Sequence, residues 1–205
     1  MTKGPRGDRW YFSLMAPNTK GDKFAWLDPT SIYINQKAFQ DLLSDLLADL
    51  ESIEFDVVGG LDAMGFVLGA AIAARRNVGF LPIRKAGKLC VETDRVSFTN
   101  YSGHTQDMEM RQPAFASGTR VLLVDQWIET GGTMEGAIEL VTRQKGIVSG
   151  LVAIAAEETP RATQLRNRFP TVTAILTGTR WQDECNAQFL SSFESYNPEQ
   201  AFPLT

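Results

Sequence analysis

An acid that is closely followed by a glycine turn lies in the middle of the chain and could hold a phosphorylated sugar. Residues 121–133 read VLLVDQWIETGGT, so four apolar residues lead to Asp125. The pattern of residues 134–145 is helical, and backbone N–H groups at a helix start bind anions. The hydroxyls of the turn can donate further hydrogen bonds. The segment therefore predicts a sugar-hydroxyl ligand at Asp125 and a phosphate site at Thr130, Gly131, Gly132 and Thr133.

Hydrophobic patterns predict the elements that would position this site. Helical spacing predicts helices over residues 37–50 and 64–75. Short apolar runs predict strands at 55–60, 78–83, 120–124, 149–156 and 172–176. Strands that alternate with helices indicate an α/β fold with an open, mainly parallel, doubly wound sheet. Ligands bind such sheets beyond the carboxyl ends of the strands, where Asp62, Arg84 and Asp125 would lie.

Size, charge and composition exclude several classes of function. A chain of 205 residues and 22.7 kDa suits one domain. The net charge of −4 argues against binding to nucleic acid or to an anionic membrane. His104 is the only histidine, which argues against a His-based triad or a multi-His metal site, and Cys90 and Cys185 are expected to be free thiols. The absence of a recognisable signal peptide or apolar span predicts a cytoplasmic protein.

Three segments in order resemble those of type I phosphoribosyltransferases, most closely the adenine phosphoribosyltransferases. Residues 125–133 are similar to the loop that binds phosphoribosyl diphosphate (PRPP). Residues 60–69 (GLDAMGFVLG) and 83–89 (IRKAGKL) resemble two upstream signature segments, and residues 24–28 (FAWLD) are similar to the family's hood. The resemblance implies one domain over residues 1–205, with hood elements at about 20–35 and a mobile flap at about 88–111.

The resemblance also implies an activity and a set of site residues. The reaction would transfer 5-phosphoribosyl from PRPP to adenine, giving AMP and diphosphate in purine salvage. Mg²⁺ would enter bound to the substrate, with no protein metal site, and the protein would be a homodimer. Asp125 would hold the ribose hydroxyls and residues 129–133 the 5′-phosphate. The remaining implied contacts are the diphosphate ligands Asp62, Ala63, Arg84 and Lys88, and the base ligands Trp26 and Leu27.

Four positions depart from the family pattern. Gln126 replaces the second acid of a pair, and Met64 and Leu27 each replace an arginine. Asn100 or Tyr101 stands where the flap carries a glutamate. Cationic contacts on a leaving diphosphate lower the reaction barrier. The departures therefore leave open an alternative, a weak or inactive homologue that binds AMP or PRPP as a sensor or an interaction subunit.

Glu129 raises a third possibility. Adenine-specific members of the family generally carry a small residue there, whereas hypoxanthine-guanine members carry an aspartate near the purine N7. Glu129 could thus be a catalytic acid-base group for another purine base. It could equally be a solvated loop carboxylate. Glu157 and Glu158 are expected to form a solvated strand end, and His104 is expected to be exposed.

Overall fold

The chain consists of two compact units. The computed structural model describes residues 10–11, 14–17, 27–99 and 104–175. One unit comprises Met1–Asp49 and Ala174–Thr205, and the other comprises Leu50–Thr173. The second unit contains the predicted phosphate loop, and so it is the unit that bears on function.

The first unit is built around one amphipathic helix. Helix α3 (Gln36–Asp49) buries Leu42, Leu43 and Leu46, which confirms the helix predicted from apolar spacing. The short helix α2 (Thr30–Ile34) precedes it, and β1 (Ala16–Pro17) pairs antiparallel with β2 (Leu27–Asp28). The predicted hood range thus contains β2 and α2, while its residues 20–26 lie outside the described part of the chain.

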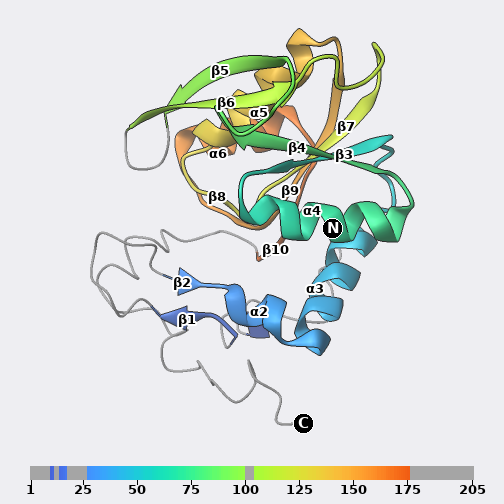
Figure 1. Ribbon diagram of the computed structural model, residues 1–205. Coiled ribbons are helices and arrows are strands. Elements are labelled where there is room, and N and C mark those ends of the chain that lie inside the picture. Colours follow the sequence, from blue (N-terminus) through green and yellow to red (C-terminus); the bar gives the residue numbers. More distant parts are fainter. Residues whose placement is uncertain (1–9, 12–13, 18–26, 100–103, 176–205) are drawn as a thin grey trace. The chain divides into compact units, whose positions relative to one another are not determined.

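The second unit has a mostly parallel sheet at its centre (Figure 1). Strand β3 (Val57–Leu61) lies between β4 (Gly79–Lys85) and β7 (Arg120–Val124) and is parallel to both. Strand β9 (Ile147–Ala156) is parallel to β7 and to the short β8 (Trp127–Ile128). The order across the sheet is β10-β9-β7-β3-β4-β6-β5, with β10 at Thr171–Ile175.

Helices cover both faces of this sheet, as Figure 1 shows. Helix α4 (Met64–Arg76) follows β3, and helix α5 (Gly132–Arg143) follows β8 on the opposite face. Helix α6 (Pro160–Arg168) packs on the same side as α5, because Ala162 and Leu165 belong to one core cluster with Met134 and Ile138. The predicted α/β class with an open, mainly parallel, doubly wound sheet is therefore confirmed.

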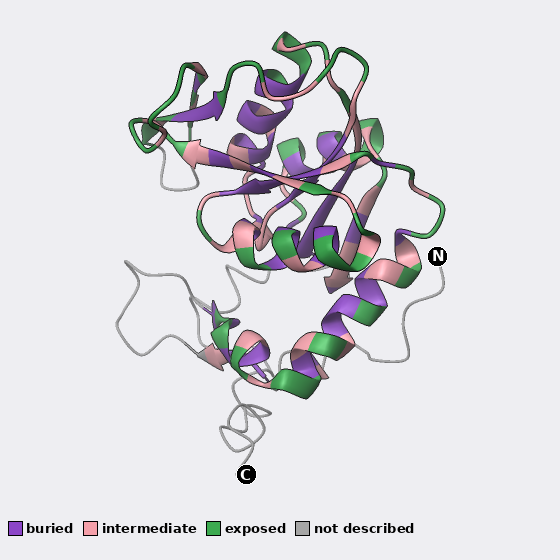
Figure 2. Ribbon diagram, turned by 45° about the vertical axis from the view of Figure 1, so that its right-hand side comes forward, coloured by how far each residue is buried: buried purple, intermediate pink, exposed green. Residues whose placement is uncertain are grey.

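Burial follows from this layering. Residues 121–124 of β7 are fully buried (Figure 2). Helices cover both faces of the sheet, so side chains that point to either side are shielded from solvent. Val121 and Leu123 point into the cluster beneath α5, and Leu122 and Val124 do not belong to that cluster. A central strand covered on both faces needs a continuous apolar run, which is why VLLV predicted it correctly.

A hairpin occupies the region predicted to be the flap. Strand β5 (Thr93–Thr99) pairs antiparallel with β6 (Thr105–Arg111), and β6 pairs antiparallel with the end of β4. Gly136 of α5 brings the helix close to the hairpin, since a Cβ there would lie 3.1 Å from Met108 Sδ and 3.3 Å from Phe98 Cβ. The hairpin therefore packs on the helix that begins at the phosphate loop.

Candidate functional site

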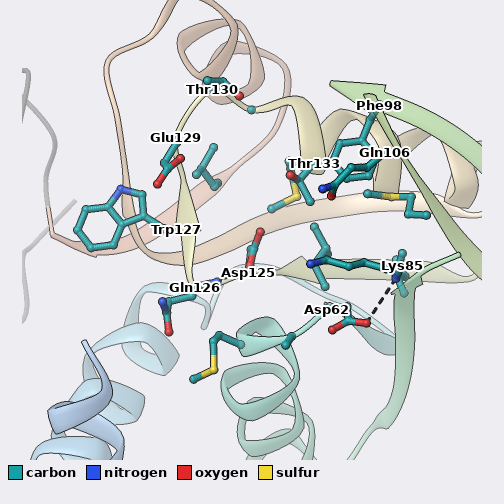
Figure 3. A pocket seen from close by; sticks show the side chains of 18 of the residues that line it. Asp62, Lys85, Phe98, Gln106, Asp125, Gln126, Trp127, Glu129, Thr130 and Thr133 are labelled. Carbon is teal, nitrogen blue, oxygen red and sulfur yellow. Dashed lines mark hydrogen bonds between the residues drawn. The ribbon is translucent and has the colours of Figure 1, made fainter. Parts of the chain in front are cut away.

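A cavity of about 310 Å³ opens at the carboxyl ends of β3, β4 and β7. Figure 3 shows side chains from all three strand ends and from the hairpin pointing into it. The expected residues that line it are Asp62, Ala63, Arg84, Asp125, Glu129, Thr130, Gly131 and Thr133. The structure thus brings three motifs that are far apart in sequence to one place.

The phosphate loop ends at the start of α5. Gly131 is the residue before the helix and has φ of +80°, a conformation that glycine adopts without strain. A Cβ on Gly132 would collide with the carbonyl oxygen of Thr99. Gly132 itself does not line the cavity, while Thr130, Gly131 and Thr133 do. Since the first N–H groups of a helix lack intrahelical acceptors, the loop provides donors for an anion.

A second helix start lies across the cavity. The peptide bond between Asp62 and Ala63 is cis, and Met64 begins α4 immediately after it. Gly65 allows this helix to approach β7, because a Cβ there would collide with the carbonyl oxygen of Val124. The cavity therefore lies between two helix N-termini, α4 and α5, whose dipoles both favour negative charge.

Arg84 and Asp62 form an ion pair at one end of the cavity. Arg84 Nε lies 3.5 Å from Asp62 Oδ2 and, although buried, makes no hydrogen bond to any described residue. Lys85 also lines the cavity, and its backbone N–H donates to Asp62 Oδ2 at 3.4 Å. Arg84 Nη1 also donates to the Lys88 carbonyl at 3.3 Å, so the guanidinium lies in the cavity wall between Asp62 and this turn.

Lys88 does not line the cavity, in contrast to its expected role. Its side chain is exposed, and its backbone N–H donates to Glu109 Oε1 at 2.7 Å. Glu109 is fully buried and also accepts a hydrogen bond from the Leu89 N–H at 2.8 Å. Burial by itself would raise the pKa of Glu109, but these N–H donors and Arg95 hold it below its ordinary value. Glu109 thus fixes the turn after Arg84.

Asp125 is an acid with an unusual proton affinity. Burial raises the pKa of Asp125 to about 7, and the Gln126 N–H, which donates to Oδ1 at 2.7 Å, opposes this shift only in part. Its carboxyl group faces the cavity between the two helix starts (Figure 3). A group in this position can both accept and donate hydrogen bonds to sugar hydroxyls near neutral pH.

Glu129 is a second acid of this kind. Burial raises its pKa to about 7, and the nearby carboxylates of Glu157 and Asp125 contribute to the shift. Its Oε2 atom is buried and has no hydrogen-bond partner among the described residues. Glu129 is half-buried and lines the cavity, and the burial of Oε2 favours a role in the site over a fully solvated loop carboxylate.

Glu157 is also buried, with 6% of its surface exposed, so the prediction of a solvated strand end was wrong there. The adjacent Glu158 is exposed, as expected, and so is His104. The strand pairing explains the difference, since successive residues at a strand end point in opposite directions. Glu157 accepts a hydrogen bond from Trp127 Nε1 at 3.3 Å.

The residues that depart from the family pattern have different positions. Met64 and Gln126 line the cavity, so both replacements affect the site itself. Leu27 is buried in the first unit. Trp26, Asn100 and Tyr101 lie outside the described residues, so the expected base contact at Trp26 stays a prediction.

Sequence reasoning missed several residues of the cavity wall. The hairpin contributes Phe98, Gln106 and Met108, and β8 contributes Trp127. The flap was predicted at residues 88–111. The alternation of polar and apolar residues in it did not show which side chains would face the cavity. Trp127 could have been found, because it stands between the two acids of the loop and so near the same strand end.

Two further features of the described residues bear on function. They include no cluster of three or more His, Cys, Asp or Glu side chains arranged to hold a metal ion. No helix among them is long and apolar enough to cross a membrane.

Comparison with known proteins identifies the family. Residues 30–185 match the model of the phosphoribosyl transferase domain. The adenine phosphoribosyltransferase of Cereibacter sphaeroides is 41% identical over 123 residues, which are 60% of this chain and 68% of that protein. That of Maridesulfovibrio salexigens is 37% identical over 139 residues, 68% of this chain and 81% of the relative. The crystal structure of the Thermoanaerobacter pseudethanolicus adenine phosphoribosyltransferase superposes with a TM-score of 0.72 at 30% identity, covering 78% of this chain and 93% of that one. The chain therefore belongs to the phosphoribosyltransferase family and is similar to its adenine phosphoribosyltransferases.

Proposed function

We propose that this protein transfers 5-phosphoribosyl from PRPP to adenine, giving AMP and diphosphate. The observation that carries the proposal is one cavity that contains the phosphate loop, Asp125, the Asp62–Ala63 turn and Arg84. A sugar with a phosphate at one end and a diphosphate at the other needs two anion sites with a hydroxyl ligand between them. The similarity to adenine phosphoribosyltransferases supports adenine as the base.

The chemistry assigns a role to each group. Displacement at the ribose C1′ builds positive charge on the sugar while the diphosphate leaves. Arg84 and the start of α4 would stabilise the departing anion, and Mg²⁺ would enter as part of the PRPP substrate. Asp125 would hold the ribose hydroxyls, and the N–H groups of the loop would fix the 5′-phosphate. Homodimer formation and action in the cytoplasm belong to the same proposal.

AMP binding tests the phosphate site directly. AMP should raise the melting temperature of the protein, because a ligand that binds only the folded state stabilises it. Gly132→Ala should abolish this rise, since its Cβ would collide with Thr99 and displace the loop. Gly79→Ala is the matched control, because its Cβ would meet only Val57 Cγ2, at an ordinary contact distance of 3.6 Å. An equal AMP response in both variants would contradict the assigned phosphate site.

A second candidate function is nucleotide binding without efficient turnover. The observation that favours it is that Met64 and Gln126 both line the cavity, where the family resemblance implies an arginine and an acid. Loss of one preorganised electrostatic contact typically costs about a hundredfold or more in rate. Under this alternative AMP binds, turnover is at background, and Met64→Arg with Gln126→Asp raises turnover. If the double variant still binds AMP but its turnover stays at background, the loss of activity has a cause other than Met64 and Gln126.

Transfer to a different purine base is the third candidate, and it rests on Glu129 as an acid-base group in the cavity. If Glu129 serves another base, Glu129→Ala should abolish turnover with that base. An increase in adenine turnover in the same variant would rule out this candidate.

A further inference from the structure

Trp127, Glu129 and Glu157 lie on two adjacent strand ends and face the same side. Strand β8 is parallel to β9, with Trp127 opposite Ala155 and Ile128 opposite Ala156. The Glu157 N–H extends this pairing, because it donates to the Ile128 carbonyl at 2.8 Å. The next residues along both strands are Glu129 and Glu157. Parallel neighbours in register point to the same face, so the two carboxyl groups lie side by side.

A hydrogen bond from Trp127 holds the Glu157 carboxyl in this position. Trp127 Nε1 donates to Glu157 Oε1 at 3.3 Å, and the Trp127 side chain itself lines the cavity. Glu158, the next residue, is exposed and lies 3.9 Å from Arg166 at its nearest charged atoms. Of the two neighbouring glutamates, only Glu157 is turned inward to Glu129.

Glu129 is incompletely satisfied in this arrangement. Its Oε2 is buried without a hydrogen-bond partner among the described residues, although the residue lines the cavity. A buried polar atom of this kind is costly unless a ligand or a proton satisfies it. A proton on the carboxyl lowers the cost of burying Oε2, and the half-buried residue still lines the cavity, where a bound base would lie.

We infer that Glu157 is a positioning residue that acts through Glu129: held by Trp127, it keeps a proton on the Glu129 carboxyl, so that Glu129 can donate a hydrogen bond to the purine. Two adjacent buried carboxylates do not both ionise readily, so the charge on Glu157 favours the protonated form of Glu129. Adenine carries ring-nitrogen acceptors, so a protonated carboxyl can donate to it where an ionised carboxylate cannot. The inference rests on the proposed function and specifies how its base is recognised.

Other charges near Glu129 do not replace Glu157 in this role. Asp125, at the end of β7, acts in the same direction but less strongly. Arg161 of α6 packs on Gly131 and Gly132. Among the described residues, the other charged ones in the cavity wall are Asp62, Arg84 and Lys85, which come from the ends of β3 and β4.

Carboxyl titration tests the inference without any turnover. The full chain, labelled with ¹³C at the glutamate carboxyl carbons, would be titrated by NMR, and Glu129→Gln would assign the signal. Glu129 should titrate near neutral pH, and Glu157→Gln should lower its midpoint by about one pH unit or more. Trp127→Phe keeps a ring but removes the N–H, so it should lower the midpoint as well. Glu158→Gln is the matched control and should leave the midpoint unchanged.

Adenine affinity provides the second readout. Calorimetry at pH 7 should show adenine binding weakened about tenfold in Glu157→Gln and unchanged in Glu158→Gln, if one lost donor corresponds to about one decade. A Glu129 midpoint that does not move in Glu157→Gln would overturn the inference, and so would a shifted midpoint with unchanged adenine affinity. Absence of turnover together with both expected results would overturn the proposed function and leave this inference in place.

Discussion

At neutral pH, Glu129 lowers the free energy of unfolding relative to a neutral side chain at the same position. The folded protein retains a proton on Glu129 up to a pH of about 7, whereas the unfolded chain releases it near 4.5. Between these values the folded state binds more protons, so this group lowers the stability of the fold as pH rises through that window. Carboxyl groups that are poised for binding often carry such a cost.

Replacing Glu129 should reverse this effect. Glu129→Gln should raise the free energy of unfolding by about 1–3 kcal/mol at pH 8 and should have little effect at pH 4, where both states are protonated. Urea denaturation of the variant and the wild type at both pH values would measure the difference. A stabilisation of the same size at pH 4 and pH 8 would show that the gain comes from packing rather than from the proton.

At the residue scale the sequence predicted which residues line the cavity better than it predicted their surroundings. Asp125 and the glycine turn were found because their order of residue types is distinctive. Glu157 was misjudged, because two adjacent glutamates look solvated unless the pairing of the strand end is known. Glu109 was missed for a similar reason, since its partners are backbone N–H groups of a turn at residues 88–89.

The site also depends on how closely whole elements approach one another. Helix α4 begins beside the end of β7 only because Gly65 has no side chain to meet the Val124 carbonyl. Gly65→Ala should therefore push α4 away from Asp125. Overpacking of this kind costs about 1–3 kcal/mol of stability, and the AMP-induced rise in melting temperature should shrink with it.

A second Gly→Ala variant, at Gly79, controls for the loss of backbone flexibility without a steric clash. Gly79, in β4, would place its Cβ 3.6 Å from Val57 Cγ2, an ordinary contact. Gly79→Ala should change the unfolding free energy by less than about 1 kcal/mol and leave the AMP response intact. The assigned approach of α4 to β7 would be wrong if Gly65→Ala behaved in the same way as this control.

Elements with strong patterns were predicted almost to their ends, and weak patterns were missed. The helix expected at residues 64–75 is Met64–Arg76, and the strand expected at 120–124 is Arg120–Val124. Helix α6 was missed because only Ala162 and Leu165 are buried in a mostly polar segment. Its start is nevertheless fixed locally, by Pro160 in the first turn and by the Thr159 side chain, which accepts from the Ala162 N–H.

At the scale of the whole molecule, the unit of residues 50–173 contains the residues of the proposed anion site. Both helix starts, Asp125 and Arg84 lie around one cavity of this unit. The expected base contacts at residues 26 and 27 belong to the other unit. Sequence could predict which motifs meet at this cavity because each motif is continuous along the chain and follows a strand of the sheet. Base recognition could not be predicted in the same way, because it depends on residues such as Glu129 and Glu157 that meet only in the fold.

Turnover is the measurement that tests the central claim most directly. The purified chain would be incubated with PRPP, Mg²⁺ and, in turn, adenine, hypoxanthine, guanine and xanthine, and nucleotide formation would be followed by chromatography. The proposed function predicts AMP from adenine, with less product from the three oxo-purines. No product with any base, while AMP still raises the melting temperature, would contradict transfer and leave a protein that works by binding.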